Sequence, residues 1–165
     1  MAIPDRLYVD ANVFVRLFEG NDELSAALAR LFLREPTGQR PLLATSELTF
    51  AELVVVPIRE GNEQLVQRYD NWTRSNEYLE IGPVDRAILW SAAALRARYS
   101  SLKLPDAIHL GTALKAGCSH FMTADLKLAG SYVLDVEHRG DAPGSAGIEV
   151  MRPDIDIIDA IVAGE

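Results

Sequence analysis

The stretch RLYVDANVF, residues 6–14, holds the pattern that decides the fold of this chain. Leu7, Tyr8 and Val9 form an uncharged, β-prone run, and Asp10 follows it directly. In a parallel α/β sheet, ligands bind in the crevice beyond the carboxyl ends of the strands. We therefore expect a buried strand that ends at a carboxylate, with the polar Asn12 close behind it.

Short β-prone runs alternate with helical patterns along the rest of the chain. Runs of apolar residues predict further strands at 41–44, 78–81, 120–122 and 148–151. Between them, apolar residues at helical spacing predict helices within 21–35, 46–56, 62–75, 84–99 and 104–117. This alternation predicts βαβ units, and hence an α/β fold, a three-layer α/β/α sandwich with a mostly parallel central sheet of about five strands.

The domain organisation is simple. The length of 165 residues fits a single domain over residues 1–165, with enough chain to bury a core. The segment EHRGDAPGSAG, residues 137–147, is rich in Gly, Pro, Ser and Asp and predicts a long loop. After it, the apolar spacing within 153–164 predicts a short C-terminal helix.

The composition is that of an ordinary globular protein, with 48% hydrophobic and 24% charged residues. No segment approaches the roughly 18 consecutive apolar residues of a membrane span, the start lacks a secretion signal, and the lone Cys118 has no disulfide partner. We therefore expect a cytoplasmic protein with no membrane contact. The net charge of −8 argues against a nucleic-acid binder that relies on a basic surface alone. An acidic metal site, however, adds to the same negative formal charge.

Three carboxylates stand where the predicted strands and helices meet. Asp10 and Asp125 follow predicted strand ends, and Asp106 follows Pro105 at a predicted helix start. Helix capping or the helix dipole explains each of the three when it is taken singly. Capping alone therefore leaves open whether they act together.

A fourth carboxylate, Glu52, is harder to explain in this way. Thr49 and Glu52 fit the T-x-x-E capping box, but Ser46 is an equally good N-cap, and Glu52 then lies inside the helix. There it shares a face with the apolar Leu48 and Val55. A carboxylate on an apolar face needs a partner, and capping does not supply one.

Clustered carboxylates indicate a cation. If the sheet brings the four acids together, they repel one another unless a cation neutralises them. Oxygen ligands without a Cys/His cluster favour Mg²⁺ or Mn²⁺ over Zn²⁺. Such ions activate water and stabilise the leaving oxygen in phosphodiester hydrolysis, which is the chemistry of a nuclease.

Four short motifs carry a resemblance to a known family. They are YVDANVFVRLF at 8–18, TSELTFAELV at 45–54, KLPDAIHLGTAL at 103–114 and HFMTADLKLA at 120–129. Each is weakly specific by itself, but their order and spacing resemble those of the PIN-domain family, most closely its VapC-type toxins of bacterial toxin–antitoxin pairs. The resemblance covers residues 7–129.

The resemblance implies a PIN fold and a Mg²⁺- or Mn²⁺-dependent endoribonuclease. The acidic quartet of the family, which would hold the metal, maps onto Asp10, Glu52, Asp106 and Asp125. Asn12 and Thr123 match polar positions that would orient these acids. The resemblance further implies an RNA substrate, a cognate antitoxin as partner and a homodimer.

Three other interpretations start from the same residues. His109 lies one helical turn after Asp106, a spacing that suits a metal pair, but we interpret it as a partly buried residue of a packing helix with satisfied hydrogen bonds. Asp10 as the covalent nucleophile of a phosphatase would need a second acid where Asn12 stands. A catalytically inactive, PIN-like protein-binding module is the third, and the intact quartet argues against it.

Overall fold

The computed structural model describes residues 4–36, 38–136 and 144–164 and contains one central sheet. Its six strands lie in the order β3-β2-β1-β4-β6-β5, and only the edge strand β5 is antiparallel to its neighbour. The strands are β1 Leu7–Val9, β2 Leu43–Ser46, β3 Leu79–Gly82, β4 His120–Met122, β5 Ser131–Val136 and β6 Gly144–Met151. The mostly parallel sheet that the sequence predicts is therefore confirmed.

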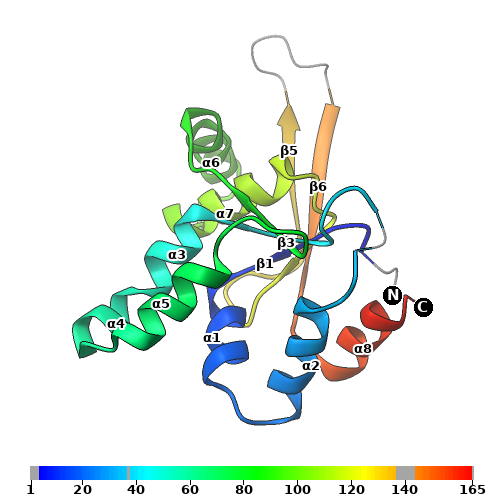
Figure 1. Cartoon of the computed structure of the whole chain (residues 1–165). Coiled ribbons are helices and arrows are strands. Elements are labelled where there is room, and N and C mark those ends of the chain that lie inside the picture. Colours follow the sequence, from blue (N-terminus) through cyan, green and yellow to red (C-terminus); the bar gives the residue numbers. More distant parts are fainter. Residues whose placement is uncertain (1–3, 37, 137–143, 165) are drawn as a thin grey trace.

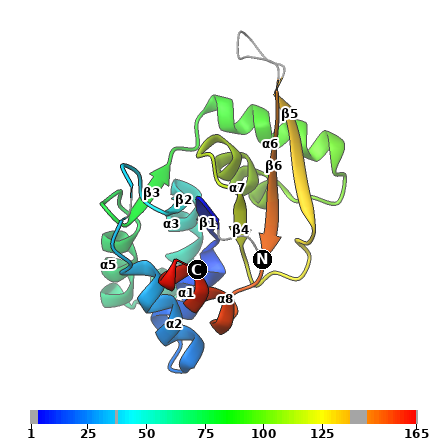
Figure 2. The same ribbon diagram turned by 90° about the vertical axis from the view of Figure 1, so that its right-hand side faces the viewer.

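Helices cover both faces of the sheet, which gives three layers (Figures 1 and 2). One face carries α1 Ala11–Glu19, α2 Glu23–Phe32, α3 Glu47–Leu53, α4 Val55–Glu60, α5 Glu63–Trp72 and α8 Ile155–Ala163. The other face carries α6 Arg86–Arg98 and α7 Leu104–Lys115. The α/β/α sandwich is thus as predicted, with an additional helix break before α4.

Alternating side chains of β1 pack into two separate hydrophobic cores, one on each face of the sheet. Leu7 and Val9 point into the core beneath α1, α2, α3 and α8, whereas Tyr8 points to the opposite core beneath α6 and α7. All three side chains are fully buried, as expected for a central strand covered on both faces. This burial explains the uncharged run that opens the sequence.

The sequence prediction was wrong at the far edge of the sheet. Strand β5 was not predicted, and residues 144–147, expected to lie in a loop, form the first part of β6. Gly144, Ser145, Ala146 and Gly147 have little strand propensity, but they pair antiparallel with β5 in a hairpin. Residues 137–143 of the predicted loop lie outside the described residues. The short C-terminal helix is confirmed as α8.

Among the described helices, none combines the length and the apolar character that crossing a membrane requires.

Candidate active site

Asp10 lies at the carboxyl end of β1, and the sheet register brings Thr123 beside it. Strands β1 and β4 are parallel neighbours with Val9 opposite Met122, so the next residue of each strand shares one edge of the sheet. There the Thr123 hydroxyl donates to Asp10 Oδ2 at 2.6 Å. Asp10 also caps α1, since its Oδ1 accepts from the backbone N–H of Ala11 at 2.7 Å. Asp10 is 8% exposed, so its carboxylate is held in place by these donors within the protein.

Asn12 completes the set of groups that hold Asp10. Its Nδ2 donates to Asp10 Oδ2 at 2.6 Å and to Thr123 Oγ1 at 2.9 Å. Its Oδ1 accepts from the backbone N–H of Ala124 at 2.8 Å, which ties α1 to the loop after β4. Asn12 and Thr123 therefore lie where residues that orient Asp10 must lie.

Glu52 reaches the same edge from α3. Ser46 is the N-cap of this helix, with its side chain accepting from Leu48 N, so the capping box of Thr49 and Glu52 does not form. Glu52 instead occupies the last turn of α3, and its side chain is 36% exposed. Its Oε2 lies 2.9 Å from Nε2 of His109 on α7, which packs beside α3.

His109 is buried more fully than the partly buried residue expected from the sequence, and it contacts the acids at this edge of the sheet. It is 2% exposed, and its Nδ1 lies 2.7 Å from the Tyr8 hydroxyl. Burial raises the pKa of Tyr8 well above its ordinary value, so this hydroxyl keeps its proton. Single ligand atoms of Asp10, Glu52 and His109 all lie within 4.8 Å of one another, and no other such trio of acids, His or Cys occurs in the described ranges.

Asp106 lies in the first turn of α7, which begins at Leu104 with Pro105 in its first turn. The pKa of Asp106 is raised, first by burial and then by the negative charges of Asp125 and Asp10. Asp106 therefore lies within electrostatic reach of both acids. Its carboxylate does not join the trio of Asp10, Glu52 and His109 at 4.8 Å.

Asp125 follows β4 in a short turn. Its Oδ1 accepts from the backbone N–H of Lys127 at 2.9 Å, and its own N–H donates to Thr123 Oγ1 at 3.0 Å. Arg152 fastens this turn from the end of β6, because its Nη1 donates to the carbonyls of Thr123 at 2.9 Å and Asp125 at 2.8 Å. Asp125 was interpreted as a helix N-cap, but no helix starts at this position. Its carboxylate instead caps a turn.

The four predicted acids thus lie at one edge of the sheet. Asp10 and Glu52 lie around His109, whose Nε2 is 4.0 Å from Asp10 Oδ1 and 2.9 Å from Glu52 Oε2. The charges of Asp10 and Asp125 act on Asp106. Carboxylate oxygens form a donor set that suits a hard divalent cation. The pKa of Asp106 is raised first by burial and then by repulsion from Asp125 and Asp10, and the charges of His109 and Lys103 offset only part of this increase. The residues present therefore fit a bound Mg²⁺ or Mn²⁺, with Asp10 and Glu52 at its centre.

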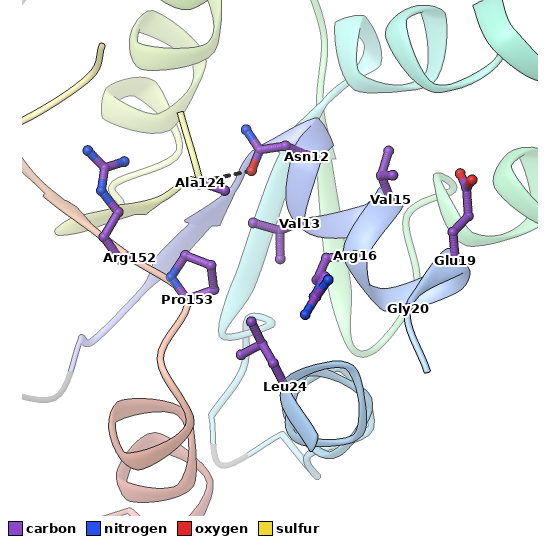
Figure 3. A pocket seen from close by; sticks show the side chains of 10 residues that line it. All are labelled: Asn12, Val13, Val15, Arg16, Glu19, Gly20, Leu24, Ala124, Arg152 and Pro153. Atoms are coloured by element: carbon purple, nitrogen blue, oxygen red, sulfur yellow. Dashed lines mark hydrogen bonds between the residues drawn. The ribbon is translucent and has the colours of Figure 1, made fainter. Parts of the chain in front are cut away.

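A cleft of about 520 Å³ opens beside Asn12, lined by residues of α1 and α2 and of the segments that follow β4 and β6 (Figure 3). Arg16 and Arg152 bring positive charge to its lining, and Val15, Leu24 and Pro153 bring apolar surface. Arg16 pairs with Asp22, and Arg152 is engaged by backbone carbonyls. The volume lies in the range of ordinary ligand pockets, and the lining includes Asn12, which holds the carboxylate of Asp10.

Sequence reasoning missed three contributors to this site. Tyr8 looked like a core residue only, Arg152 carried no motif, and His109 was assigned to packing. The spacing of His109 one turn after Asp106 was the available signal, since residues three apart share a helix face. No sequence motif predicts the contacts of Tyr8 or Arg152, because these contacts depend on the order of the strands in the sheet.

Solved structures share this architecture. A chain of a toxin–antitoxin complex from Klebsiella pneumoniae is 27% identical with a TM-score of 0.52, over 73% of this chain and 86% of that one. The VapC20 toxin of Mycobacterium tuberculosis, described as cleaving the sarcin–ricin loop, is 17% identical with a TM-score of 0.56, over 70% of this chain and 86% of its own. At 17% identity, this second likeness shows the fold alone.

Sequence comparison gives the family. Ribonuclease VapC23 of Mycobacterium tuberculosis is 28% identical over 126 residues, which is 76% of this chain and 98% of that protein. The sequence pattern of the PIN domain matches residues 7–130, a stretch that includes all four acids. The chain therefore belongs to the PIN domain family.

Proposed function

We propose that this protein is a Mg²⁺- or Mn²⁺-dependent endoribonuclease that acts as the toxin of a toxin–antitoxin pair. Membership of the PIN domain family and a relative named as a ribonuclease support nuclease activity on RNA. The toxin–antitoxin complex that is 27% identical to this chain supports the toxin role. The proposal includes an RNA substrate and a cytoplasmic location of the protein.

The observation that carries the proposal is the convergence of acids from separate elements on one edge of the sheet. Asp10 comes from the end of β1, Glu52 from α3, Asp106 from α7 and Asp125 from the turn after β4. In this proposal the four acids hold the metal. Asn12 and Thr123 fix the carboxylate of Asp10 through the hydrogen bonds described above.

The residues of the chain have distinct tasks in the proposed reaction. A bound divalent ion supplies Lewis acidity that activates water and stabilises the leaving oxygen of the phosphodiester. Asp10 presents its carboxylate in a fixed orientation because its donors are themselves fixed by β4 and α1. Asp106 and Asp125 add the negative charge that retains the cation. The cleft beside Asn12 gives the flanking nucleotide room.

The proposal extends to partners. A cognate antitoxin is the expected protein partner, supported by the complex from Klebsiella pneumoniae. The homodimer that the family resemblance implies stays a prediction, which light scattering on the purified protein would test. The antitoxin prediction is tested by whether a co-expressed antitoxin suppresses RNA cleavage.

RNA cleavage by purified protein tests the central activity. Structured and unstructured RNAs are incubated with the full chain in Mn²⁺, Mg²⁺ or EDTA, beside Asp106→Asn and the control Glu63→Gln at an exposed helix start. The proposal expects cleavage that needs the ion, disappears in Asp106→Asn and persists in Glu63→Gln. Failure of antitoxin-free protein to cut any RNA with any ion, or equal cutting by Asp106→Asn, would favour the protein-binding module instead.

A further inference from the structure

A chain of two hydrogen bonds, the first of them buried, leads from the sheet to Glu52. The Tyr8 hydroxyl lies 2.7 Å from Nδ1 of His109, and Nε2 of the same ring lies 2.9 Å from Glu52 Oε2. These residues come from β1, α7 and α3, so the chain of contacts links three elements. Tyr8 is 0% and His109 is 2% exposed, which leaves the ring little freedom to turn.

The two central acids differ in how they are held. Asp10 accepts from a backbone N–H and from the side chains of Asn12 and Thr123. Glu52 has a longer side chain, is more exposed and receives its hydrogen bond in the described structure from His109. A glutamate loses considerable rotamer entropy when it is fixed, and a neighbouring carboxylate repels it. Glu52 therefore depends on His109 for its place beside Asp10.

We propose that His109 is a positioning residue, which holds the Glu52 carboxylate beside Asp10 before the metal arrives and is itself anchored by Tyr8. This inference rests on the proposed metal-dependent function and assigns a role to a residue outside the acidic quartet.

The direction of the hydrogen bonds defines the role. A carboxylate only accepts, so Nε2 of His109 must carry the hydrogen that it donates to Glu52. A metal ligand, in contrast, would have to offer a lone pair from that same nitrogen. Positioning and ligation therefore make different predictions for the same atom.

Substitutions at His109 separate the donated hydrogen bond from the bulk of the ring. His109→Leu removes the donor, whereas His109→Gln can place an amide N–H where Nε2 lies. The matched control is Thr112→Val on the same buried helix, where the hydroxyl donates only to the backbone carbonyl of Ile108. Tyr8→Phe keeps the ring that packs the strand and removes the hydroxyl that anchors His109, together with its interactions with Thr45 and Thr49.

Mn²⁺ binding, followed by electron paramagnetic resonance on the full chain, is the direct readout. We expect His109→Leu to weaken Mn²⁺ binding by roughly 10- to 100-fold, with Tyr8→Phe between it and the wild type. His109→Gln should recover most of the affinity, and Thr112→Val should bind like the wild type. In RNA cleavage, His109→Leu should lower kcat at saturating Mn²⁺ while KM for RNA stays unchanged.

Two results would overturn the proposal. One is unchanged Mn²⁺ affinity in a folded His109→Leu or, if that variant does not fold, in Tyr8→Phe. The other is a nitrogen coupling to bound Mn²⁺ that disappears in His109→Gln, because it would make His109 a ligand.

A metal-free crystal structure of His109→Leu keeps this inference separate from the proposed function. If wild-type protein binds no Mn²⁺, the metal-dependent function fails, and the position of Glu52 still decides the role of His109. We expect the Glu52 carboxylate to leave its place beside Asp10 in His109→Leu and to keep it in Thr112→Val. A Glu52 side chain that stays in place without His109 would contradict positioning.

Discussion

Carboxylates at the two ends of the parallel sheet differ in the charges that surround them. At the amino end, Glu80 of β3 pairs with Arg6 at 2.6 Å and with Arg40 at 2.9 Å. At the carboxyl end, Asp106 has no ion pair within 4.0 Å among the described residues and faces Asp10 and Asp125. Glu80 is neutralised by arginines of the chain itself, whereas for the acids at the carboxyl end we propose that a bound cation neutralises them.

The pKa values of the two acids move in opposite directions for this reason. Burial by itself would raise the pKa of Glu80, but hydrogen bonds and charges from Arg40 and Arg6 outweigh it and lower that pKa. Burial also raises the pKa of Asp106, and there Asp125 and Asp10 add to the increase while His109 and Lys103 offset only part. By linkage, ionised Glu80 stabilises the fold and ionised Asp106 destabilises it.

The largest expected effect is on catalysis at the carboxyl end. Asp106→Asn should lower the rate of RNA cleavage by at least about 100-fold, because the substitution weakens the cation site. Glu80→Gln, the matched change at the amino end, should leave cleavage of folded protein within about twofold of wild type. Single-turnover cleavage rates of both variants measure the difference. A similar loss in both would erase the functional distinction between the two ends.

The next effect is on stability at the amino end. Glu80→Gln leaves the guanidinium of Arg6, whose side chain is 7% exposed, without its carboxylate. The free energy of unfolding should fall by roughly 1–3 kcal/mol in urea denaturation at neutral pH.

Acidification sharpens this second prediction. Because folding lowers the pKa of Glu80, its stabilisation is present above the unfolded pKa and is lost as the pH falls through the folded pKa. The gap in stability between wild type and Glu80→Gln should therefore close as the solution is acidified. A gap that stays constant with pH would assign the loss to packing.

A smaller loss is expected where the chain fastens Asp125. The Arg152 guanidinium holds this turn with two nitrogens, because Nη1 donates to the carbonyls of Thr123 and Asp125 and Nη2 donates to that of Leu128. Arg152→Lys leaves a single ammonium nitrogen, which cannot take both places. The turn should loosen, and Mn²⁺ affinity should fall by about tenfold in a calorimetric titration. Affinity equal to that of wild type would show that the turn holds Asp125 without Arg152.

The smallest effect is a gain in stability. In EDTA, Asp106→Asn should raise the melting temperature by roughly 1–3 °C, because it removes a charge that its acidic neighbours repel. The gain should be absent at pH values below the unfolded pKa of Asp106, where the carboxyl is protonated in both states. A calorimetric scan at both pH values measures it, and a lower melting temperature at neutral pH would indicate that Asp106 is structurally compensated.

Much of the fold follows from the sequence because the signals are local. The apolar run before Asp10 and the helical spacing of the following segments predict the sandwich and the parallel sheet. Strand β5 and the first part of β6 escape prediction because they stabilise each other across a hairpin, and Gly144 and Gly147 carry no strand signal. Pairing between segments, which sets the edge of the sheet, is not a property of either segment alone.

The candidate site divides in the same way. Asp10 and Asp125 can be placed from their strand ends, and Asp106 from its helix start. The contacts of Glu52 cannot be predicted from the sequence, because they depend on α3 packing against α7 and on the buried ring of His109. The role of Arg152 is harder still to predict, because it reaches the turn that carries Asp125 through the position of β6 beside β4.

Calorimetric titration of metal-free protein with Mn²⁺ tests the central claim that the acids at the carboxyl end form a cation site. Wild type and Glu80→Gln should bind with similar affinity, and Asp106→Asn should bind at least about tenfold more weakly. Wild-type protein that binds no Mn²⁺, or Asp106→Asn that binds it equally well, would contradict the account.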